Sequence, residues 1–536
     1  MSESSDYIIV GGGTAGCILA ARLSEDPATR VTLLEAGPED RDIWIHIPAG
    51  YARLFKSGKF DWKFATEPEP ELDGRAIPWP RGRVLGGSGS INGLVFLRGS
   101  PHDYDRWAQS GARGWSYADV VPYFRRLESW EGPAGETRGK QGPVPVSHPK
   151  RLSLGASAFI AACEALGFPR NRDVNDGPIE GVTPIQMNVR QGRRISTAQA
   201  YLRPARSRPN LRVVTGVVAR RILIENNRAV GVAGHGASGE QATWRAAREV
   251  VVCCGTVATP KLLMLSGIGD AEALTAMDIP VAVHAPEVGR NLQDHFITRV
   301  AFRTKPAGTM NEIAASRIRM AGMALGYALR RDGPMAVGAT EATLFARVLP
   351  GAEEADVQFQ FINFSLTGTG YVLARHPGFM FNFNQCRPES RGMLTLRSPD
   401  SEDKPVIRAN YLDHPTDRRV MVESAKLAQR IGRTPPFVDL VEQELSPAAD
   451  GANDEALLRH IRQIGTTVFH PCGTCRMGSD ARAVVTPDLR VRGLDGLRVA
   501  DASVMPLVPS SNIQPAVMMI AERAADFLRD RMAQAA

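Results

Sequence analysis

A glycine-rich turn near the N-terminus has the spacing needed to bind a dinucleotide. Gly11, Gly13 and Gly16 fit the pattern G-x-G-x-x-G directly after an apolar run at residues 7–10. Nineteen residues past Gly16, Glu35 ends a second apolar run. Such a turn brings backbone N–H groups close to a pyrophosphate, and an acid at this distance accepts a hydrogen bond from a ribose hydroxyl. We therefore predict a dinucleotide site, whose acid favours NAD or FAD over NADP but does not distinguish between NAD and FAD.

His470 lies in the strongest motif among the ten histidines, Phe469-His470-Pro471. A reaction that removes a proton from its substrate needs a base. Imidazole, with a reference pKa of about 6.5, is the side chain best suited to accept that proton near neutral pH. A histidine before a proline is structural more often than catalytic, so the motif alone leaves both roles open.

Two cysteines follow this histidine in the run Pro471-Cys472-Gly473-Thr474-Cys475. The run matches the P-C-x-x-C half of zinc deaminases, but the H-x-E half occurs nowhere in the chain. A zinc site would lack a second ligand pair, and a redox pair would lack a thioredoxin-like context. We expect no metal site and structural thiols.

Residues 82–99 form a second segment rich in glycine and serine. It either offers backbone amides to a polar ligand or is merely a flexible loop, and its composition leaves both readings open.

The totals limit the class of protein. A chain of 536 residues implies two or more domains. Its 64 basic and 57 acidic residues give a net charge of +7 without a continuous basic run, which argues against nucleic-acid binding. We find no secretory signal and no apolar run long enough to span a membrane. Seven cysteines suit a reducing compartment. We expect a cytoplasmic protein and leave open a peripheral association with the inner membrane.

Four ordered stretches resemble the glucose–methanol–choline (GMC) oxidoreductases. They are residues 82–99, residues 255–269, Phe469-His470-Pro471 and residues 493–503. The choline-dehydrogenase-like branch, which includes bacterial alcohol dehydrogenases, is the most similar, through residues 80–83, 288–295 and 473–478. The resemblance implies FAD as the cofactor. Some relatives attach FAD through a histidine in the first stretch, and Ile91 occupies that position here, so we expect non-covalent FAD.

The resemblance also implies which residues contact FAD. The first turn and the following strand end supply Gly11, Gly13, Thr14, Ala15, Gly16, Glu35 and Ala36. The second segment supplies Arg83, Gly86, Gly87, Ser88, Asn92, Gly93, Leu94 and Val95. Val218 and Ala219 would face the adenine, and Asp501, Ala502, Asn512 and Ile513 would lie near the flavin or pyrophosphate. Asp501 also fits a purely structural turn acid.

By the same resemblance, His470 is the general base and Asn512 is the second catalytic residue. An asparagine amide can donate a hydrogen bond to the alcohol oxygen without competing as a base. Asparagine is also a common helix N-cap, and a helix is expected from just beyond Asn512 to Leu528. Its N-terminus would favour negative charge on the flavin. His295 is expected to pack or to hydrogen-bond rather than to catalyse.

We predict an α/β fold (α+β overall), in which a Rossmann-type FAD-binding domain is interleaved with a substrate domain built on an antiparallel sheet. The FAD-binding segments are 1–153, 210–298 and 466–536, and the substrate segments are 154–209 and 299–465. Strands are expected at 7–10, 31–35, 211–214, 248–254, 359–364 and 379–386, with a turn at 226–227. Residues 38–79 read as a long ordered loop.

The expected reaction is FAD-dependent oxidation of a primary alcohol to an aldehyde, with hydride transfer to flavin N5. Electrons would pass to a quinone, another carrier or oxygen, and we favour a dehydrogenase over an oxidase. A flavin-containing hydroxynitrile lyase and a protein with a purely structural flavin are the alternatives. Long-chain, aromatic, choline-like, sugar-derived and pyridoxine-like alcohols all remain open as substrates.

Overall fold

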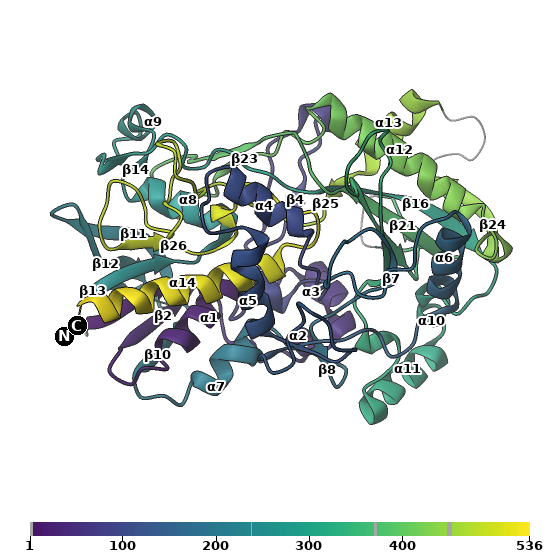
Figure 1. Cartoon of the computed structure of the whole chain (residues 1–536), viewed down its shortest axis with the longest axis horizontal. Helices are drawn as coiled ribbons and strands as arrows, with labels where there is room; N and C mark the ends of the chain where they lie inside the picture. The colour runs from purple at the N-terminus through teal and green to yellow at the C-terminus, as the bar shows by residue number, and fades with distance from the viewer. Residues whose placement is uncertain (1–3, 237, 369–371, 447–452, 536) are drawn as a thin grey trace.

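Two β-sheets and the helices that cover them form most of the computed structural model, which describes residues 4–236, 238–368, 372–446 and 453–535. The first sheet lies at the end of the molecule that holds both termini, and the second lies at the opposite end (Figure 1). The predicted mixed α/β architecture is confirmed.

The first sheet has seven strands in the order β10-β2-β1-β13-β12-β11, with β26 paired to β13 as well. Its strands are β1 (Ser4–Val10), β2 (Val31–Glu35), β10 (Leu211–Thr215), β11 (Val218–Glu225), β12 (Arg228–His235), β13 (Gln241–Val252) and β26 (Leu497–Val499). β10, β2, β1, β13 and β26 pair in parallel, whereas β11 and β12 form an antiparallel hairpin. Asn226 and Asn227, both with positive φ, make the predicted hairpin turn. Parts of the chain that are far apart in sequence thus build one sheet.

Helix α1 (Thr14–Leu23) connects β1 to β2 and lies very close to the glycine turn. Gly11 has a φ of +101°, in the region that favours glycine. A Cβ on Gly16 would lie 1.9 Å from the Gly11 carbonyl oxygen, so only glycine permits this approach. The turn therefore requires glycine for backbone geometry at one position and for packing at another.

The long C-terminal helix α14 (Gln514–Ala535) packs along α1. Its fully buried Glu522 accepts hydrogen bonds from Arg22 at 2.8 Å and from the Tyr201 hydroxyl at 2.6 Å, and it pairs with Arg126 at 2.8 Å. Removing one partner of such a buried ionic group typically costs about 3–5 kcal/mol. This network fixes the axis of α14 and with it the position of the residues that precede the helix.

The second sheet is antiparallel and has the order β24-β16-β21-β18-β17-β7, with β25 paired to β16. Its strands are β7 (Gly181–Pro184), β16 (Phe296–Thr304), β17 (Thr340–Ala346), β18 (Val357–Ile362), β21 (Gly378–Gln385), β24 (Val441–Ser446) and β25 (Thr466–Thr467). Helices α6 (Leu154–Ala165), α12 (Pro415–Gly432) and α13 (Asp454–Ile464) pack against this sheet. The strands predicted at 359–364 and 379–386 are therefore confirmed within two residues.

Successive residues of β18 and β21 point to opposite faces of the second sheet, as the two-residue period of a strand requires. Phe361 and Phe381 pack with Phe159 of α6 on the helix-covered face. Gln360, which precedes Phe361, and Asn382, which follows Phe381, are register partners and line the cavity described below. Burial of the aromatic face thus orients a polar pair toward the site.

Residues 38–79 are not the long loop that we predicted. They contain α2 (Ile43–His46), η1 (Pro48–Gly50), α3 (Tyr51–Ser57), β3 (Phe64–Ala65), η2 (Pro70–Leu72) and β4 (Pro78–Trp79). Ile45 and Leu54 are buried in a small apolar cluster with Val84 and Ile91. The prediction was wrong because these short helices owe their stability to residues outside the segment.

The remaining α-helices and small strand pairs lie outside the two large sheets. The helices are α4 (Pro101–Gln109), α5 (Tyr117–Leu127), α7 (Arg203–Ala205), α8 (Gly255–Leu265), α9 (Ala271–Thr275), α10 (Met310–Ala314) and α11 (Arg317–Arg330). Small strand pairs are β5 (Glu128–Trp130) with β6 (Val144–Val146), β8 (Val189–Arg190) with β9 (Arg193–Arg194), β14 (Ile268–Gly269) with β15 (Val283–His284), β19 (Leu366–Thr367) with β20 (Val372–Leu373), and β22 (Met393–Thr395) with β23 (Val406–Arg408). Within the described ranges, no helix is both long and apolar enough to cross a membrane.

The proposed division into domains stays a prediction. The second sheet takes β7 from residues 154–209 and most of its other strands from residues 299–465. β16 begins three residues before that second range, and β25 lies just after it.

Candidate active site

A cavity of about 630 Å³ is lined by residues of both sheets. Most of the predicted cofactor and catalytic residues line it. They are Gly11, Gly13, Thr14, Ala15, Glu35, Ala36, Arg83, Gly87, Ser88, Asn92, Gly93, Leu94, Val95, Val218, Ala219, His470, Asp501, Ala502, Asn512 and Ile513. The cavity joins the glycine turn to His470, so one continuous space connects the predicted nucleotide contacts with the predicted base.

Two predicted cofactor residues, Gly16 and Gly86, support the cavity wall without lining it. Gly16 permits the close approach of α1 to the turn described above. Gly86 has a φ of +85°, and its N–H donates to the Gly12 carbonyl at 2.7 Å. A Cβ on Gly87 would lie 2.8 Å from the Cα of Gly13, so the two glycine segments touch backbone to backbone. The segment at 82–99 is thus built into the wall by close backbone packing.

Glu35 holds the nucleotide end of the cavity. Its two carboxylate oxygens accept hydrogen bonds from the N–H groups of Gly12 at 2.8 Å and Gly37 at 2.7 Å. Burial raises the pKa of Glu35 to about 7, against the opposing effect of these two N–H groups. The carboxyl group is therefore anchored to the turn and keeps acceptor capacity for a ribose hydroxyl.

Buried polar atoms near the glycine segments fit a polar cofactor. Gln514, at the start of α14, accepts a hydrogen bond from Asn92 Nδ2 at 2.5 Å. Its own Nε2 is buried and has no hydrogen-bond partner among the described residues. A Cβ on Gly89 would lie 2.8 Å from this Nε2, so glycine leaves room beside the donor. Such a cradle suits an acceptor-rich ligand such as a dinucleotide.

Asp501 stabilises the cavity wall between the glycine turn and His470. Its Oδ2 accepts from the Gly255 N–H at 2.8 Å and the Thr259 hydroxyl at 2.6 Å, and its Oδ1 accepts from the Ser503 N–H at 2.8 Å. These bonds tie the start of α8 to residues 501–504. Asp501 therefore acts as a structural acid in this structure, and its contact with FAD stays a prediction.

Three side chains from distant segments meet at the other end of the cavity. His470 Nε2 lies 3.0 Å from Asn512 Nδ2, and His470 Nδ1 lies 2.9 Å from His295 Nδ1. His295 Nε2 lies 3.0 Å from the Cys386 carbonyl oxygen. Asn512 lies two residues before the first residue of α14, and its side chain contacts His470 and Gln358.

The hydrogen-bond partners determine which nitrogen of each ring carries a proton. The Cys386 carbonyl can only accept, so His295 Nε2 donates to it and, in a neutral ring, His295 Nδ1 accepts. His470 Nδ1 must then donate, which leaves a lone pair on His470 Nε2. That lone pair accepts from Asn512 Nδ2, and Asn512 Oδ1 accepts from Gln358 Nε2 at 3.5 Å. The nitrogen that faces the cavity is therefore the basic one.

Both histidines are held neutral. Burial lowers the pKa of His295 to about 4 and that of His470 well below its usual value of 6.5. Proximity to His295 and to the Arg81 guanidinium lowers the pKa of His470 further. Near pH 7 both rings are thus uncharged, as the proton assignment above requires.

Asp294 positions the backbone of His470. Its Oδ1 accepts from the His470 N–H at 2.8 Å, and its Oδ2 accepts from the Thr467 hydroxyl at 2.6 Å and from the Tyr411 hydroxyl. Phe469 has a φ of +69°, which is unfavourable for a bulky residue. The sequence motif predicted His470 as a functional residue, but it did not indicate that Asp294 holds the backbone of His470 in place.

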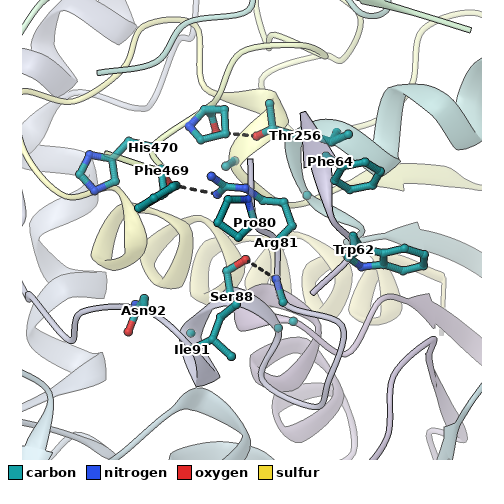
Figure 2. Close-up of a pocket in the computed structure, with 18 of the residues that line it drawn as sticks. Trp62, Phe64, Pro80, Arg81, Ser88, Ile91, Asn92, Thr256, Phe469 and His470 are labelled. Atoms are coloured by element: carbon teal, nitrogen blue, oxygen red, sulfur yellow. Dashed lines mark hydrogen bonds between the residues drawn. The ribbon is translucent and has the colours of Figure 1, made fainter. Parts of the chain in front are cut away.

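Arg81 is a further polar residue of the site that the sequence reasoning did not assign. Its Nη1 donates to the Phe469 carbonyl at 3.0 Å, the bond drawn as a dashed line in Figure 2. Its Nε and Nη2 are buried without a hydrogen-bond partner among the described residues. The resemblance implied Arg83 of the same motif as an FAD contact, but no feature of the sequence assigned a role to Arg81.

The polar pair on the second sheet was missed as well. Gln360 and Asn382 line the cavity, and Gln360 Nε2 and Asn382 Oδ1 are buried without a partner in the part of the chain that the structure describes. Apolar residues surround them. Ile297, Ala339, Ile362, Phe364, Leu366 and Met380 form this apolar wall.

Cys472 and Cys475 are fully buried, and burial raises the pKa of both thiols. Protonated thiols lack the nucleophilic form that redox exchange requires, which fits structural cysteines. Within the described ranges, no group of three or more histidine, cysteine or acidic side chains is arranged to hold a metal ion.

The comparisons with known proteins identify the family. Two family models, both described as GMC oxidoreductase, match residues 5–297 and 388–521. An uncharacterised GMC-type oxidoreductase of Mycobacterium tuberculosis is 43% identical over 536 residues, covering 99% of this chain and 100% of that protein. The chain belongs to the GMC oxidoreductase family. An oxygen-dependent choline dehydrogenase of Brucella canis is also 39% identical over 533 residues, covering 98% of this chain and 96% of that protein.

Solved structures of GMC oxidoreductases have the same fold. Pyridoxine 4-oxidase from Mesorbium loti matches with a TM-score of 0.90 and 32% identity, covering 98% of this chain and 99% of that one. A formate oxidase variant from Aspergillus oryzae, solved to examine FAD modification, matches with a TM-score of 0.92 and 28% identity over 100% of both chains. The predicted family and FAD are confirmed. As an oxidoreductase of this flavoenzyme class, the protein takes a small-molecule substrate and an electron acceptor.

Proposed function

We propose that this GMC oxidoreductase oxidises a primary alcohol to an aldehyde, with His470 as the general base. The observation that supports this best is the lone pair on His470 Nε2, which faces the cavity 3.0 Å from a donating amide of Asn512. A hydroxyl group that enters between the two side chains gives its proton to Nε2 and accepts an N–H from Asn512.

FAD, when bound, supplies the hydride acceptor at its N5 atom. Glu35 and the backbone of the glycine turn would hold its adenosine half, and Gln514 and the segment at 82–95 would hold the remainder. Ile91, at the position where some relatives attach FAD, has no nucleophilic atom and is 6% exposed in an apolar cluster. FAD would therefore carry no covalent bond at this position.

The base works because its surroundings keep it neutral before the reaction. Burial, His295 and Arg81 all disfavour the imidazolium ion, so His470 is available as a base across the neutral range. After it accepts the substrate proton at Nε2, its Nδ1–H continues to donate to His295. The N-terminus of α14 adds partial positive charge beside Asn512 and Ile513, which both line the cavity.

The substrate is a neutral alcohol. Glu35, Glu402 and Asp501 are the acidic residues among those that line the cavity. Glu35 and Asp501 accept backbone N–H groups, and Glu402 is 58% exposed and pairs with Arg220. Among the described residues that line the cavity, a quaternary ammonium substrate would find no free carboxylate. Gln360 and Asn382 suit an uncharged polar group on the substrate, and the surrounding apolar wall suits a hydrocarbon or ring portion.

The electron acceptor is a quinone or another carrier, as in a dehydrogenase, with oxygen as the alternative. One similar protein is named a dehydrogenase, the oxygen-dependent choline dehydrogenase, and another is named an oxidase, pyridoxine 4-oxidase.

Anaerobic mixing of the purified holoenzyme with a panel of neutral alcohols tests the proposal. We expect loss of the oxidised-flavin absorbance with at least one alcohol that has a second polar group, and no change in a His470→Gln variant that retains FAD. Admitting air then separates fast reoxidation by oxygen from slow reoxidation. Cyanohydrin cleavage without flavin reduction by any alcohol would overturn the proposal in favour of a lyase.

A further inference from the structure

Helix α11 presents an apolar stripe to solvent at the edge of the molecule (Figure 1). Ile318 is 86% exposed, Leu325 is 60% exposed and Leu329 is 72% exposed. At 100° per residue, Leu325 and Leu329 each lie within about 20° of Ile318 around the helix axis. Single exposed apolar residues are ordinary, but three aligned on one face of one helix mark an interaction surface.

The opposite face of α11 anchors the helix to the body of the protein. Tyr327 lies about 180° from Ile318 around the axis and is 4% exposed. Its hydroxyl donates to the Gly192 carbonyl at 2.9 Å, and its ring packs with Ile47 and Ala336. The stripe therefore points directly away from the protein.

Arginines flank the stripe, and acids are absent from it. Arg317 lies on one flank of the helix, Arg319 and Arg330 lie on the other, and Arg331 follows at the C-cap. The sequence has no acidic residue from 313 to 331. Two acids border this run: Glu312 lies 3.6 Å from Arg319, and Asp332 directly follows Arg331, which stacks over the ring of Tyr327. The surface of the helix thus combines an apolar centre with a net positive rim.

We propose that α11 docks this protein onto an anionic lipid bilayer. An outward apolar face between arginines is the pattern of helices that lie in the interfacial plane of a membrane, where the apolar side chains enter the acyl boundary and the guanidinium groups meet phosphates. A second copy of the chain is disfavoured as the occupant, because a self-complementary contact through this face would bring the same arginines together.

Docking through α11 would place the bilayer beside the cavity. The cluster that anchors Tyr327 contains Ile47 and Ala336, and a few residues further along the chain Tyr51 and Ala339 line the cavity. On the proposed function, an apolar alcohol or a lipid-soluble electron acceptor would then reach the site from the membrane. This last step depends on the proposed function, whereas the docking itself does not.

Co-sedimentation of the holoenzyme with vesicles tests the docking. We expect the wild-type protein to bind vesicles of phosphatidylcholine with about one third phosphatidylglycerol roughly ten-fold more strongly than pure phosphatidylcholine vesicles, with the difference reduced by salt. The variant Ile318→Gln/Leu325→Gln/Leu329→Gln should lose about ten-fold or more of this binding. Arg317→Gln/Arg330→Gln should weaken binding to the anionic vesicles and leave the weak binding to neutral vesicles unchanged.

Two controls test whether a loss of vesicle binding is specific to α11. The variant Leu154→Gln/Val281→Gln removes apolar side chains that are 56% and 42% exposed elsewhere, and it should bind like the wild type. Flavin absorbance, and flavin reduction by a water-soluble alcohol without vesicles, report folding and the proposed function separately from docking. Equal binding of the triple variant and the wild type would overturn the proposal. A wild-type dimer in solution that the triple variant converts to a monomer would also overturn it, in favour of a second copy as the occupant.

Discussion

The two ends of the cavity bury ionisable groups of opposite kind, and burial favours the neutral form of both. At the nucleotide end it raises the pKa of Glu35 to about 7, and at the other end it lowers the pKa of His470 well below 6.5. The neighbours differ. Two backbone N–H groups oppose the effect of burial at Glu35, whereas His295 and Arg81 reinforce it at His470. One end is thus arranged to hold a hydrogen-bonding ligand, and the other is arranged to keep a base uncharged.

Replacing His470 should cause the largest change. In His470→Gln, we expect kcat to fall by about 10³-fold, the usual contribution of general base catalysis, because no other basic nitrogen faces the same point. Bound FAD, measured as flavin absorbance per protein, should be largely retained, since Glu35 and the glycine turn at the other end of the cavity would hold its adenosine half. Stopped-flow measurement of flavin reduction isolates the chemical step. A variant that reduces its flavin at the wild-type rate would refute the assignment of the base.

Replacing His295 tests whether it positions the proton of His470. In His295→Phe, the His470 ring loses the acceptor for its Nδ1–H, so a fraction of it adopts the tautomer protonated at Nε2. We expect kcat to fall about ten-fold with little change in KM.

The pH profile distinguishes this role from a structural one. In the wild type, kcat/KM should be constant above pH 6.5 and fall only below it, since activity needs neutral His470 and its pKa is depressed. Without His295 one depressing influence is gone, so the acid limb should move toward pH 6.5. His295→Asn, which keeps an acceptor, should restore part of kcat. A lower kcat with an unmoved acid limb would indicate structural damage alone.

Glu35→Gln should weaken FAD binding with a smaller effect on catalysis. The amide nitrogen cannot accept one of the two backbone N–H groups, and the loss of a charge-assisted hydrogen bond is worth about ten-fold in affinity. Dissociation of FAD, followed by the rise in its fluorescence, measures the change. Glu39→Gln is the matched control, because Glu39 pairs with Arg206 at the surface and does not line the cavity. Equal FAD affinity in both variants would remove Glu35 from the cofactor site.

The sequence predicted one end of the cavity better than the other, for a physical reason. The glycine turn and Glu35 lie within thirty residues of one another, so their spacing is visible along the chain. His470 and Asn512 were named because their motifs resemble a known family. The contact of His470 with His295 joins residues 175 positions apart, and nothing local in either stretch indicates it.

In the antiparallel sheet, too, contacts between distant residues were not predictable from the sequence. Its strands were predicted from alternating apolar residues, and β18 and β21 appear where expected. The alignment of Gln360 with Asn382 depends on strand register, which a single sequence does not specify before the partner strand is known. The helices at 43–57 were missed because residues outside the segment bury their apolar side chains.

The paired cysteines next to His470 should matter least to catalysis. In Cys472→Ala/Cys475→Ala, we expect kcat within about two-fold of the wild type, since both thiols are protonated and neither lines the cavity. Each replacement removes one buried sulfur atom, so the free energy of unfolding should fall by about 1 kcal/mol per site, seen as a small decrease in Tm. Cys163→Ala, which removes one equally buried thiol from α6, should lower Tm by about half as much as the double variant. A loss of kcat in the double variant alone, at unchanged FAD content, would show that the thiols act on the base rather than only on packing.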